Sequence, residues 1–249
     1  VYKRQDIYDH RNIQCDVLVV GAGISGILAA RNAAKNNLKT LLVDEKNELG
    51  GATIYQNREF NKIDNQSSSD WIKKEIRELK NIKNLEIKTR TSVAAYHGYN
   101  YLLARENLTD HLEKKDKNNK VRQRLLKIRA KKVILATGAL ERPLIFNNND
   151  RPGIMLSTAV KKYADFFGVK CGKKNVFFTN NDSAYESALC LYNKGIKVDA
   201  IVDIRDNSNS KIVKATEKAG IKIYWSHTVV DTKGYLSLIH ISEPTRLLS

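Results

Sequence analysis

Three glycines with a fixed spacing carry the clearest chemical signal in the sequence. Gly21, Gly23 and Gly26 follow an apolar, strand-like segment and open a helix-like one. In a G-x-G-x-x-G turn the first glycine permits the tight turn, the second lets a pyrophosphate approach the backbone, and the third lets the helix pack on the strand. Free N–H groups at the helix start attract phosphate. We therefore predict a dinucleotide site, with Ala22 and Ser25 in the same turn.

An acidic pair ends the next apolar segment. Asp44 follows Leu-Leu-Val and precedes Glu45. A carboxylate there accepts hydrogen bonds from a ribose diol and repels a 2′-phosphate, which favours NAD or FAD over NADP. The spacing favours Asp44, with Glu45 as the alternative. Gly50 and Gly51 follow, in a flexible turn where the backbone can approach a ligand.

The elements that must position these residues follow from periodicity. Apolar spacing predicts a helix over 69–82, and alternation predicts a strand over 85–93 that ends at Val93. Strand-rich segments on both sides of a basic stretch, 114–129, predict an antiparallel excursion. A buried strand in 133–138 should return beside the first strand and bring its last residues, Thr137 and Gly138, near the pyrophosphate.

A second βαβ pattern lies further along the chain, after a proline-containing link and a helix over 157–167. Its turn, Thr179 to Asp182, contains no glycine. Its side chains should crowd a pyrophosphate, and Asp182 should cap the helix while disfavouring an anion. We predict a nucleotide-like fold that has lost its nucleotide, extended by a helix over 212–219 and a strand over 222–229.

These elements predict an α/β chain with the FAD/NAD(P)-binding, Rossmann-like three-layer fold of the glutathione-reductase type. The expected parts are a dinucleotide-binding domain at 14–142, a crossing segment at 143–171 and a second, nested βαβ domain at 172–235. The two ends, 1–13 and 236–249, are expected to lie outside the fold.

That expectation comes from an inverted repeat in the coding sequence. The residues VYKRQ at 1–5 and LSLIH at 236–240 can be encoded by reverse-complementary strings, as adaptors used in sequencing libraries would produce. We therefore expect 1–5 and 236–249 to be adaptor-derived, 6–13 to be a linker, and the chain to be a truncated, internal piece of a longer protein.

Composition narrows the function classes. The 249 residues carry a net charge of +16, with 42% hydrophobic and 28% charged residues. The lysines are dispersed, so we expect no nucleic-acid partner and instead a basic patch that meets an acidic partner subunit. No apolar run reaches the ~20 residues of a membrane span. Three scattered cysteines indicate a cytoplasmic protein without a disulfide framework or a metal site.

The chain resembles the alpha subunit of heterotetrameric sarcosine oxidase. The motifs that carry the resemblance are CDVLVVGAGISG, LLVDEKNELGG, YNYLLARENLTDHL, RQRLLKIRAKKVILATGALERPLIFNNNDRPGIML and VFFTNNDSAYESAL. The resemblance implies oxidative demethylation of sarcosine, a small-molecule amine, to glycine. The methyl group leaves as formaldehyde or passes to tetrahydrofolate, and reduced flavin gives peroxide with oxygen.

The same resemblance implies NAD on this chain, FAD and FMN mainly on a flavin-bearing beta subunit, and further small subunits. It assigns NAD contacts to Gly21, Gly23, Gly26, Asp44, Gly51, Val93 and Gly138. The family's folate-binding region has no counterpart here, and we find no catalytic constellation, so we expect no activity from this chain alone.

Other assignments remain open at this stage. Alpha subunits of opine oxidases and of hydrogen cyanide synthase share the glycine motif and the ATG strand. A structural module that binds NAD and docks a flavoprotein would need no catalytic residues of its own. A thioredoxin-reductase-like enzyme fits less well, because the chain has no C-x-x-C pair.

Overall fold

The computed structural model describes residues 6–55, 62–117, 120–233 and 238–242. The chain divides into two compact units between Ala139 and Leu140, and each unit is described by itself. Within the described residues, no helix is both long and apolar enough to cross a lipid bilayer.

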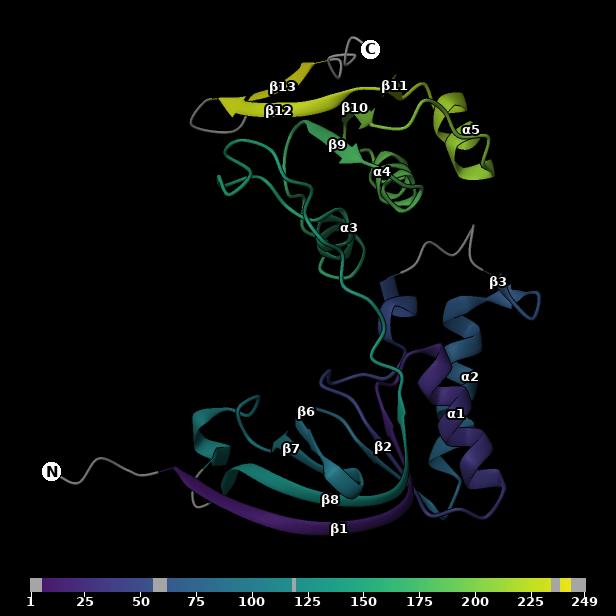
Figure 1. The fold of residues 1–249 in the computed structure, drawn as a ribbon, viewed down its shortest axis with the longest axis vertical. Coiled ribbons are helices and arrows are strands. Elements are labelled where there is room, and N and C mark those ends of the chain that lie inside the picture. Colours follow the sequence, from purple (N-terminus) through teal and green to yellow (C-terminus); the bar gives the residue numbers. More distant parts are fainter. Residues whose placement is uncertain (1–5, 56–61, 118–119, 234–237, 243–249) are drawn as a thin grey trace, which may run out of the picture. The chain divides into compact units, whose positions relative to one another are not determined.

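The first unit is built on a six-stranded sheet with the order β5-β2-β1-β8-β7-β6 (Figure 1). The strands are β1 (Ile7–Val20), β2 (Thr40–Val43), β5 (Leu85–Lys88), β6 (Thr91–His97), β7 (Tyr101–Asn107) and β8 (Val121–Leu135). Strands β5, β2, β1 and β8 are parallel, and β8, β7 and β6 are antiparallel. The predicted antiparallel excursion is therefore confirmed.

Two helices cover one face of the parallel strands, α1 (Ile24–Lys35) and α2 (Ser68–Lys80). Small residues such as Ala30 let α1 lie close to the sheet, and Trp71 and Leu79 of α2 pack into the same core. Ser67 caps α2 by accepting the N–H of Asp70 at 3.2 Å. The shorter elements of this unit are η1 (Gly51–Tyr55), β3 (Lys62–Ile63), β4 (Gln66–Ser67), η2 (Gly98–Asn100) and η3 (Lys114–Lys117).

The β6–β7–β8 meander covers the other face. Leu102, Ala104 and Leu126 of the meander pack against Val20 and Val43 of the parallel strands in one buried cluster. Helices, parallel sheet and meander therefore form the three predicted layers. Figure 1 shows β1 and β8 curving side by side from the parallel sheet into the meander.

The structure corrects three sequence predictions in this unit. The first strand begins at Ile7 rather than Cys15, so residues 7–13 belong to the fold and not to a linker. The predicted strand over 85–93 is two strands, because Arg90 turns the chain with a φ of 51°. The strand predicted as buried over 133–138 ends at Leu135, which is 59% exposed.

The second unit contains a parallel sheet with the order β11-β10-β9. Its elements are α3 (Ser157–Asp165), β9 (Asn175–Thr179), α4 (Ser183–Asn193), β10 (Val198–Asp203), α5 (Lys211–Lys218), β11 (Lys222–Trp225), β12 (Thr228–Lys233) and β13 (Leu238–Ser242). Tyr185 and Leu191 of α4, Ile201 of β10 and Val213 of α5 form its core. The predicted βαβ pattern is confirmed.

Two predictions in this unit were wrong in detail. The single strand expected over 222–229 is divided by Ser226, whose φ is 55°. The stretch 236–249 was expected to lie outside the fold, but Leu238–Ser242 pairs antiparallel with β12.

Helix α3 begins at Ser157, and its N-cap residue, Leu156, supplies no capping side chain. Glu141 caps it instead, from sixteen residues upstream. One carboxylate oxygen accepts the N–H and O–H of Ser157, and the other accepts those of Thr158, at 2.6–3.0 Å. Burial would raise the pKa of Glu141, but these hydrogen bonds outweigh it and lower the pKa below its ordinary value.

The Glu141→Gln variant is therefore expected to lower the unfolding free energy at neutral pH by about 1 kcal/mol. Because the folded pKa is depressed, this stabilisation is present above the unfolded pKa of about 4.3 and is lost as pH falls through the folded value. Urea unfolding of both proteins at several pH values checks this. A difference that did not shrink in acid would contradict it.

Candidate dinucleotide-binding site

The glycine turn joins the carboxyl end of β1 to the start of α1. Gly21 has a φ of 98°, and a Cβ there would overlap the carbonyl oxygen of Ala136, which follows β8. A Cβ on Gly26 would overlap the carbonyl oxygen of Gly21. Both positions therefore require glycine for the fold itself.

Gly23 differs from these two glycines. It lies at the N-cap of α1 with a φ of −72°, and a Cβ built there meets no atom within 4 Å. The chain gives no internal steric reason for glycine at this position. The open space before a helix N-terminus is where an anionic group is favoured, so the site fits a pyrophosphate.

Asp44 is held against this turn. Its carboxylate accepts the N–H of Ala22 at 2.6 Å and the N–H of Lys46 at 2.8 Å. Asp44 itself is 9% exposed, whereas Glu45 is exposed. The acid that follows β2 is thus in direct contact with the glycine turn, and its contact with a ribose stays a prediction.

The second pair of glycines also contacts the turn. The N–H of Gly50 donates to the carbonyl of Ala22 at 2.7 Å, and a Cβ on Gly51 would lie 2.9 Å from the Cα of Gly23. Their φ values of 125° and 58° are strained for other residues. These two glycines therefore let the loop after β2 lie directly on the glycine turn.

The remaining predicted residues surround the turn less closely. Thr137 and Gly138 follow Ala136, whose N–H donates to the carbonyl of Val20 at 2.7 Å, and both are exposed. Ser25 is exposed on the first turn of α1. Val93 lies in β6 and packs against the meander core, without a described contact to the glycines. Ala136 is a site residue that the sequence analysis did not name.

The turn of the second βαβ unit has a different construction. Asp203, at the end of β10, is completely buried and accepts hydrogen bonds from the Tyr185 hydroxyl at 2.8 Å and from Arg205 at 2.7–3.2 Å. Arg205 also lies 2.8 Å from Asp182. Asp182 occupies the N-cap of α4, but its side chain makes no capping bond, contrary to the prediction.

This network of hydrogen bonds and ion pairs around Asp203 and Arg205 was not predicted from the sequence, although the sequence holds a signal for it. The segment AIVD ends β10 as LLVD ends at Asp44, so an acid occupies the same place in both βαβ units. Burial would raise the pKa of Asp182, but hydrogen bonds from Ser210 and Arg205 lower it, so Asp182 stays ionised at the helix start. In the second unit, Tyr185 and Arg205 thus occupy Asp203, the acid that a ribose would otherwise use.

Comparison with known proteins agrees with this geometry. Residues 16–139 match the family of FAD-dependent oxidoreductases. The chain is 39% identical over 240 residues to the sarcosine oxidase alpha subunit of Corynebacterium sp. (strain P-1), and 36% identical over 200 residues to that of Rhizobium meliloti (strain 1021). The chain is a homologue of sarcosine oxidase alpha subunits. The first alignment covers 95% of this chain and the second 80%, but only 24% and 20% of the relatives.

Solved structures of other oxidoreductases share the fold of this chain. The L-proline dehydrogenase from P. horikoshii matches with a TM-score of 0.63 and 25% identity over 80% of this chain and 38% of that one. A thioredoxin reductase from T. acidophilum matches with a TM-score of 0.65 and 19% identity, over 94% of this chain and 72% of that one. The FAD/NAD(P)-binding fold, with a second βαβ unit, is confirmed.

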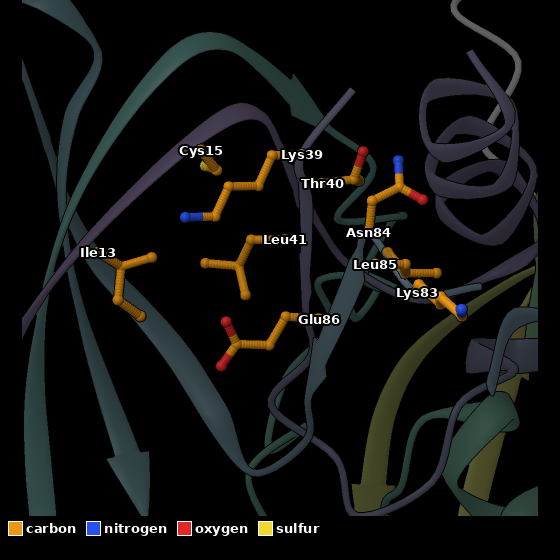
Figure 2. Close-up of a pocket in the computed structure, with 9 residues that line it drawn as sticks. All are labelled: Ile13, Cys15, Lys39, Thr40, Leu41, Lys83, Asn84, Leu85 and Glu86. Atoms are coloured by element: carbon orange, nitrogen blue, oxygen red, sulfur yellow. The ribbon is translucent and has the colours of Figure 1, made fainter. Parts of the chain in front are cut away.

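A separate cavity of about 260 Å³ lies at the amino ends of the parallel strands, where β2 and β5 begin (Figure 2). It is lined by Ile13, Cys15, Lys39, Thr40, Leu41, Lys83, Asn84, Leu85 and Glu86. Burial raises the pKa of Cys15 to about 11, so its thiol stays protonated at neutral pH. None of the lining residues belongs to the glycine turn, so the cavity is distinct from it.

The turn of the second βαβ unit is expected to bind no dinucleotide, so the chain should bind one dinucleotide in all. Arg205, Asp203 and Asp182 satisfy one another there, and Asp182 repels a phosphate. Calorimetric titration of the intact subunit with NAD measures the stoichiometry. Two sites per chain, with the second lost in Asn181→Ala, would show that the glycine-free turn binds.

Proposed function

We propose that this chain is the dinucleotide-binding part of a sarcosine oxidase alpha subunit. The observation that carries the proposal is the similarity to such subunits, at 36–39% identity over 80–95% of the chain. The arrangement of the glycine turn with Asp44 and the Gly50–Gly51 loop supports it, because these contacts hold an acid and a glycine loop against the turn, as a phosphate- and ribose-binding site would require.

The dinucleotide is proposed to be NAD. The proposed contacts are Gly21, Ala22, Gly23, Ser25, Gly26, Asp44, Glu45, Gly50, Gly51, Val93, Thr137 and Gly138. The start of α1 supplies N–H groups to the pyrophosphate, and Asp44 supplies an acceptor to the ribose while disfavouring NADP. The flavins, FAD and FMN, are proposed to lie mainly on a beta subunit, and they supply the oxidation of the amine.

The proposed overall reaction is that of the complex, not of this chain alone. Sarcosine, oxygen and water give glycine, formaldehyde and hydrogen peroxide, or the methyl group passes to tetrahydrofolate. Within the described residues, we assign no catalytic residue beside the glycine turn. This chain is therefore proposed to bind and orient a dinucleotide and to assemble with the flavin-bearing subunit.

The substrate class is proposed to be an amino acid with a secondary amine. Sarcosine and L-proline, which appear in the names of two similar proteins, share this group. The intact alpha subunit, purified with its partner subunits, is expected to form peroxide with sarcosine. Activity with proline or an opine but not sarcosine would assign a related oxidase, and activity of this chain alone would contradict the division of labour.

The Asp44→Ala variant is expected to weaken NAD binding by about 1.5–3 kcal/mol, because a charge-assisted hydrogen bond to the ribose is lost. Discrimination against NADP should fall as well. Since Asp44 also accepts the Ala22 N–H, Asp44→Asn separates the loss of charge from the loss of the turn contact. Glu45→Ala is the matched control, and a larger loss there would assign the ribose to Glu45.

A further inference from the structure

The outer surface of the β6–β7–β8 meander, continued onto the neighbouring strand β1, carries several positively charged side chains. Along β8, the buried residues Leu126, Ile128 and Ala130 alternate with outward-facing ones. The outward set on β8 is Leu125, Lys127, Arg129 and Lys131. We call the surface formed by these residues and their cross-strand neighbours the basic face.

The strand register supplies those neighbours. Arg105, Leu103 and Tyr101 of β7 lie opposite Leu125, Lys127 and Arg129. His10, Asn12 and Gln14 of β1 lie opposite the same three residues on the other side. Residues directly opposite one another share a face of the sheet, so cations, aliphatic groups and an aromatic ring form one continuous surface.

Most of this charge has no internal partner. Lys131 pairs with Asp16 at 2.8 Å, but among the described residues no carboxylate lies within ion-pairing distance of Arg105, Lys127 or Arg129. Like charges on neighbouring strands repel one another, so the clustering of these charges does not itself stabilise the fold. An acidic surface brought against it would remove the repulsion.

A strained turn at the edge of the basic face presents an exposed aromatic ring. Tyr99 and Asn100 have φ values of 57° and 53°, and Tyr99 is 94% exposed. Asn100 accepts the Tyr96 hydroxyl at 2.7 Å and donates to the carbonyl of Lys131, while Arg129 donates to the carbonyl of Tyr99. The turn is thus held in an unfavourable conformation that projects a tyrosine beside arginine, a combination typical of binding hot spots.

The ring geometry favours a protein partner over a nucleic acid. The guanidinium of Arg129 lies 5.0 Å from the centre of the Tyr101 ring and covers one face, which a stacking base would need. Leu103 and the 41% exposed Leu125 lie between the cations and interrupt a continuous phosphate track. Mixed aliphatic, tyrosine and arginine surfaces are instead typical of protein interfaces.

We propose that the basic face docks an acidic surface of the flavin-bearing partner subunit. The inference rests on the proposed function for the existence of that subunit, but it assigns the contact to particular residues. The basic face lies on the meander layer, whereas the dinucleotide site lies at the carboxyl ends of β1 and β2. Docking and dinucleotide binding should therefore be separable by mutation.

The test uses the intact alpha subunit coexpressed with its partner subunit. Arg105→Glu with Lys127→Glu is the main variant, because neither side chain has a described ion pair whose loss would destabilise the chain. The control is Lys214→Glu with Lys218→Glu on α5, which makes the same change in net charge at two exposed positions. Tyr99→Asn removes the ring while keeping a residue that tolerates the left-handed backbone.

The main variant is expected to bind the partner at least about tenfold more weakly than wild type, and Tyr99→Asn about tenfold more weakly. The α5 control should bind the partner as wild type does, and the affinity of the variants for NAD should stay unchanged. Salt should weaken the wild-type complex and not the remaining binding of the main variant. Wild-type assembly and NAD stoichiometry test the proposed function separately.

Three outcomes would overturn the proposal. Equal binding by the main variant and the α5 control would show that the basic face is solvated. Binding of a 20-nucleotide single strand that is lost in the main variant would assign the face to a nucleic acid. If the variant subunit alone melts at a lower temperature than wild type, and this loss of stability accounts for its weaker assembly, the face makes an internal contact.

Discussion

The Gly23→Val variant of the intact subunit is expected to lose NAD binding by at least about 100-fold, or about 3 kcal/mol, without unfolding. The open space at this position and its ordinary backbone conformation mean that a side chain fits the protein but occupies the room of the pyrophosphate. The unfolding free energy should change by less than about 1 kcal/mol. Calorimetry with NAD and urea unfolding measure the two quantities.

Gly26→Ala provides the contrast. Its added methyl group would overlap the Gly21 carbonyl oxygen, so the turn must move and both stability and binding should fall. Affinity within threefold of wild type in Gly23→Val would remove the assignment of this turn to a pyrophosphate. A large loss of stability in Gly23→Val would show that the position matters for the fold alone.

The Asp203→Ala variant is expected to destabilise the second unit by about 3 kcal/mol. Removing this buried carboxylate leaves the Tyr185 hydroxyl and the Arg205 guanidinium without their shared acceptor. Asp203→Asn should cost less, because an amide oxygen still accepts one of these bonds. Asp206→Ala, which removes an exposed acceptor of Ser226, is the matched control.

Fluorescence can assign the loss to one unit. The chain has two tryptophans, Trp71 in the first unit and Trp225 in the second. Trp225 stacks on Tyr185 at 6.2 Å between ring centres, so it reports on the network directly. In a Trp71→Phe background, the urea midpoint of Asp203→Ala should fall well below that of Asp206→Ala. Equal midpoints would show that the network contributes little.

The sequence predicted those parts of the fold that depend on local patterns. The glycine spacing, the apolar segments and the acid after β2 gave the first βαβ unit, and the second unit followed from the same alternation. The errors came at left-handed residues, Arg90 and Ser226, where a single backbone conformation divides what reads as one continuous strand. No side-chain periodicity signals such a break, because both halves keep their own alternation.

Some contacts around the glycine turn follow from the fold pattern and others do not. Contacts between segments adjacent in the βαβ unit, such as Asp44 with Ala22, follow from the fold pattern. Contacts that depend on where a distant strand ends do not, and Ala136 was missed for this reason. Residues 7–13 were set aside because of the terminal repeat, although they pair with β8 from Ile7 onward. Long-range pairing of this kind leaves little trace in a strand with polar, exposed residues.

The pairing of β1 with β8 has a consequence for how the chain reaches its native state. Ile7 pairs with Val121 and Val20 with Leu135, and the hundred residues 21–120 separate the two strands in the sequence. During synthesis the apolar segment around Val17 emerges from the ribosome long before its partner exists. Contacts so distant in sequence slow folding and leave hydrophobic surface open to aggregation meanwhile. We therefore expect the first unit to be most prone to aggregation before β8 is synthesised.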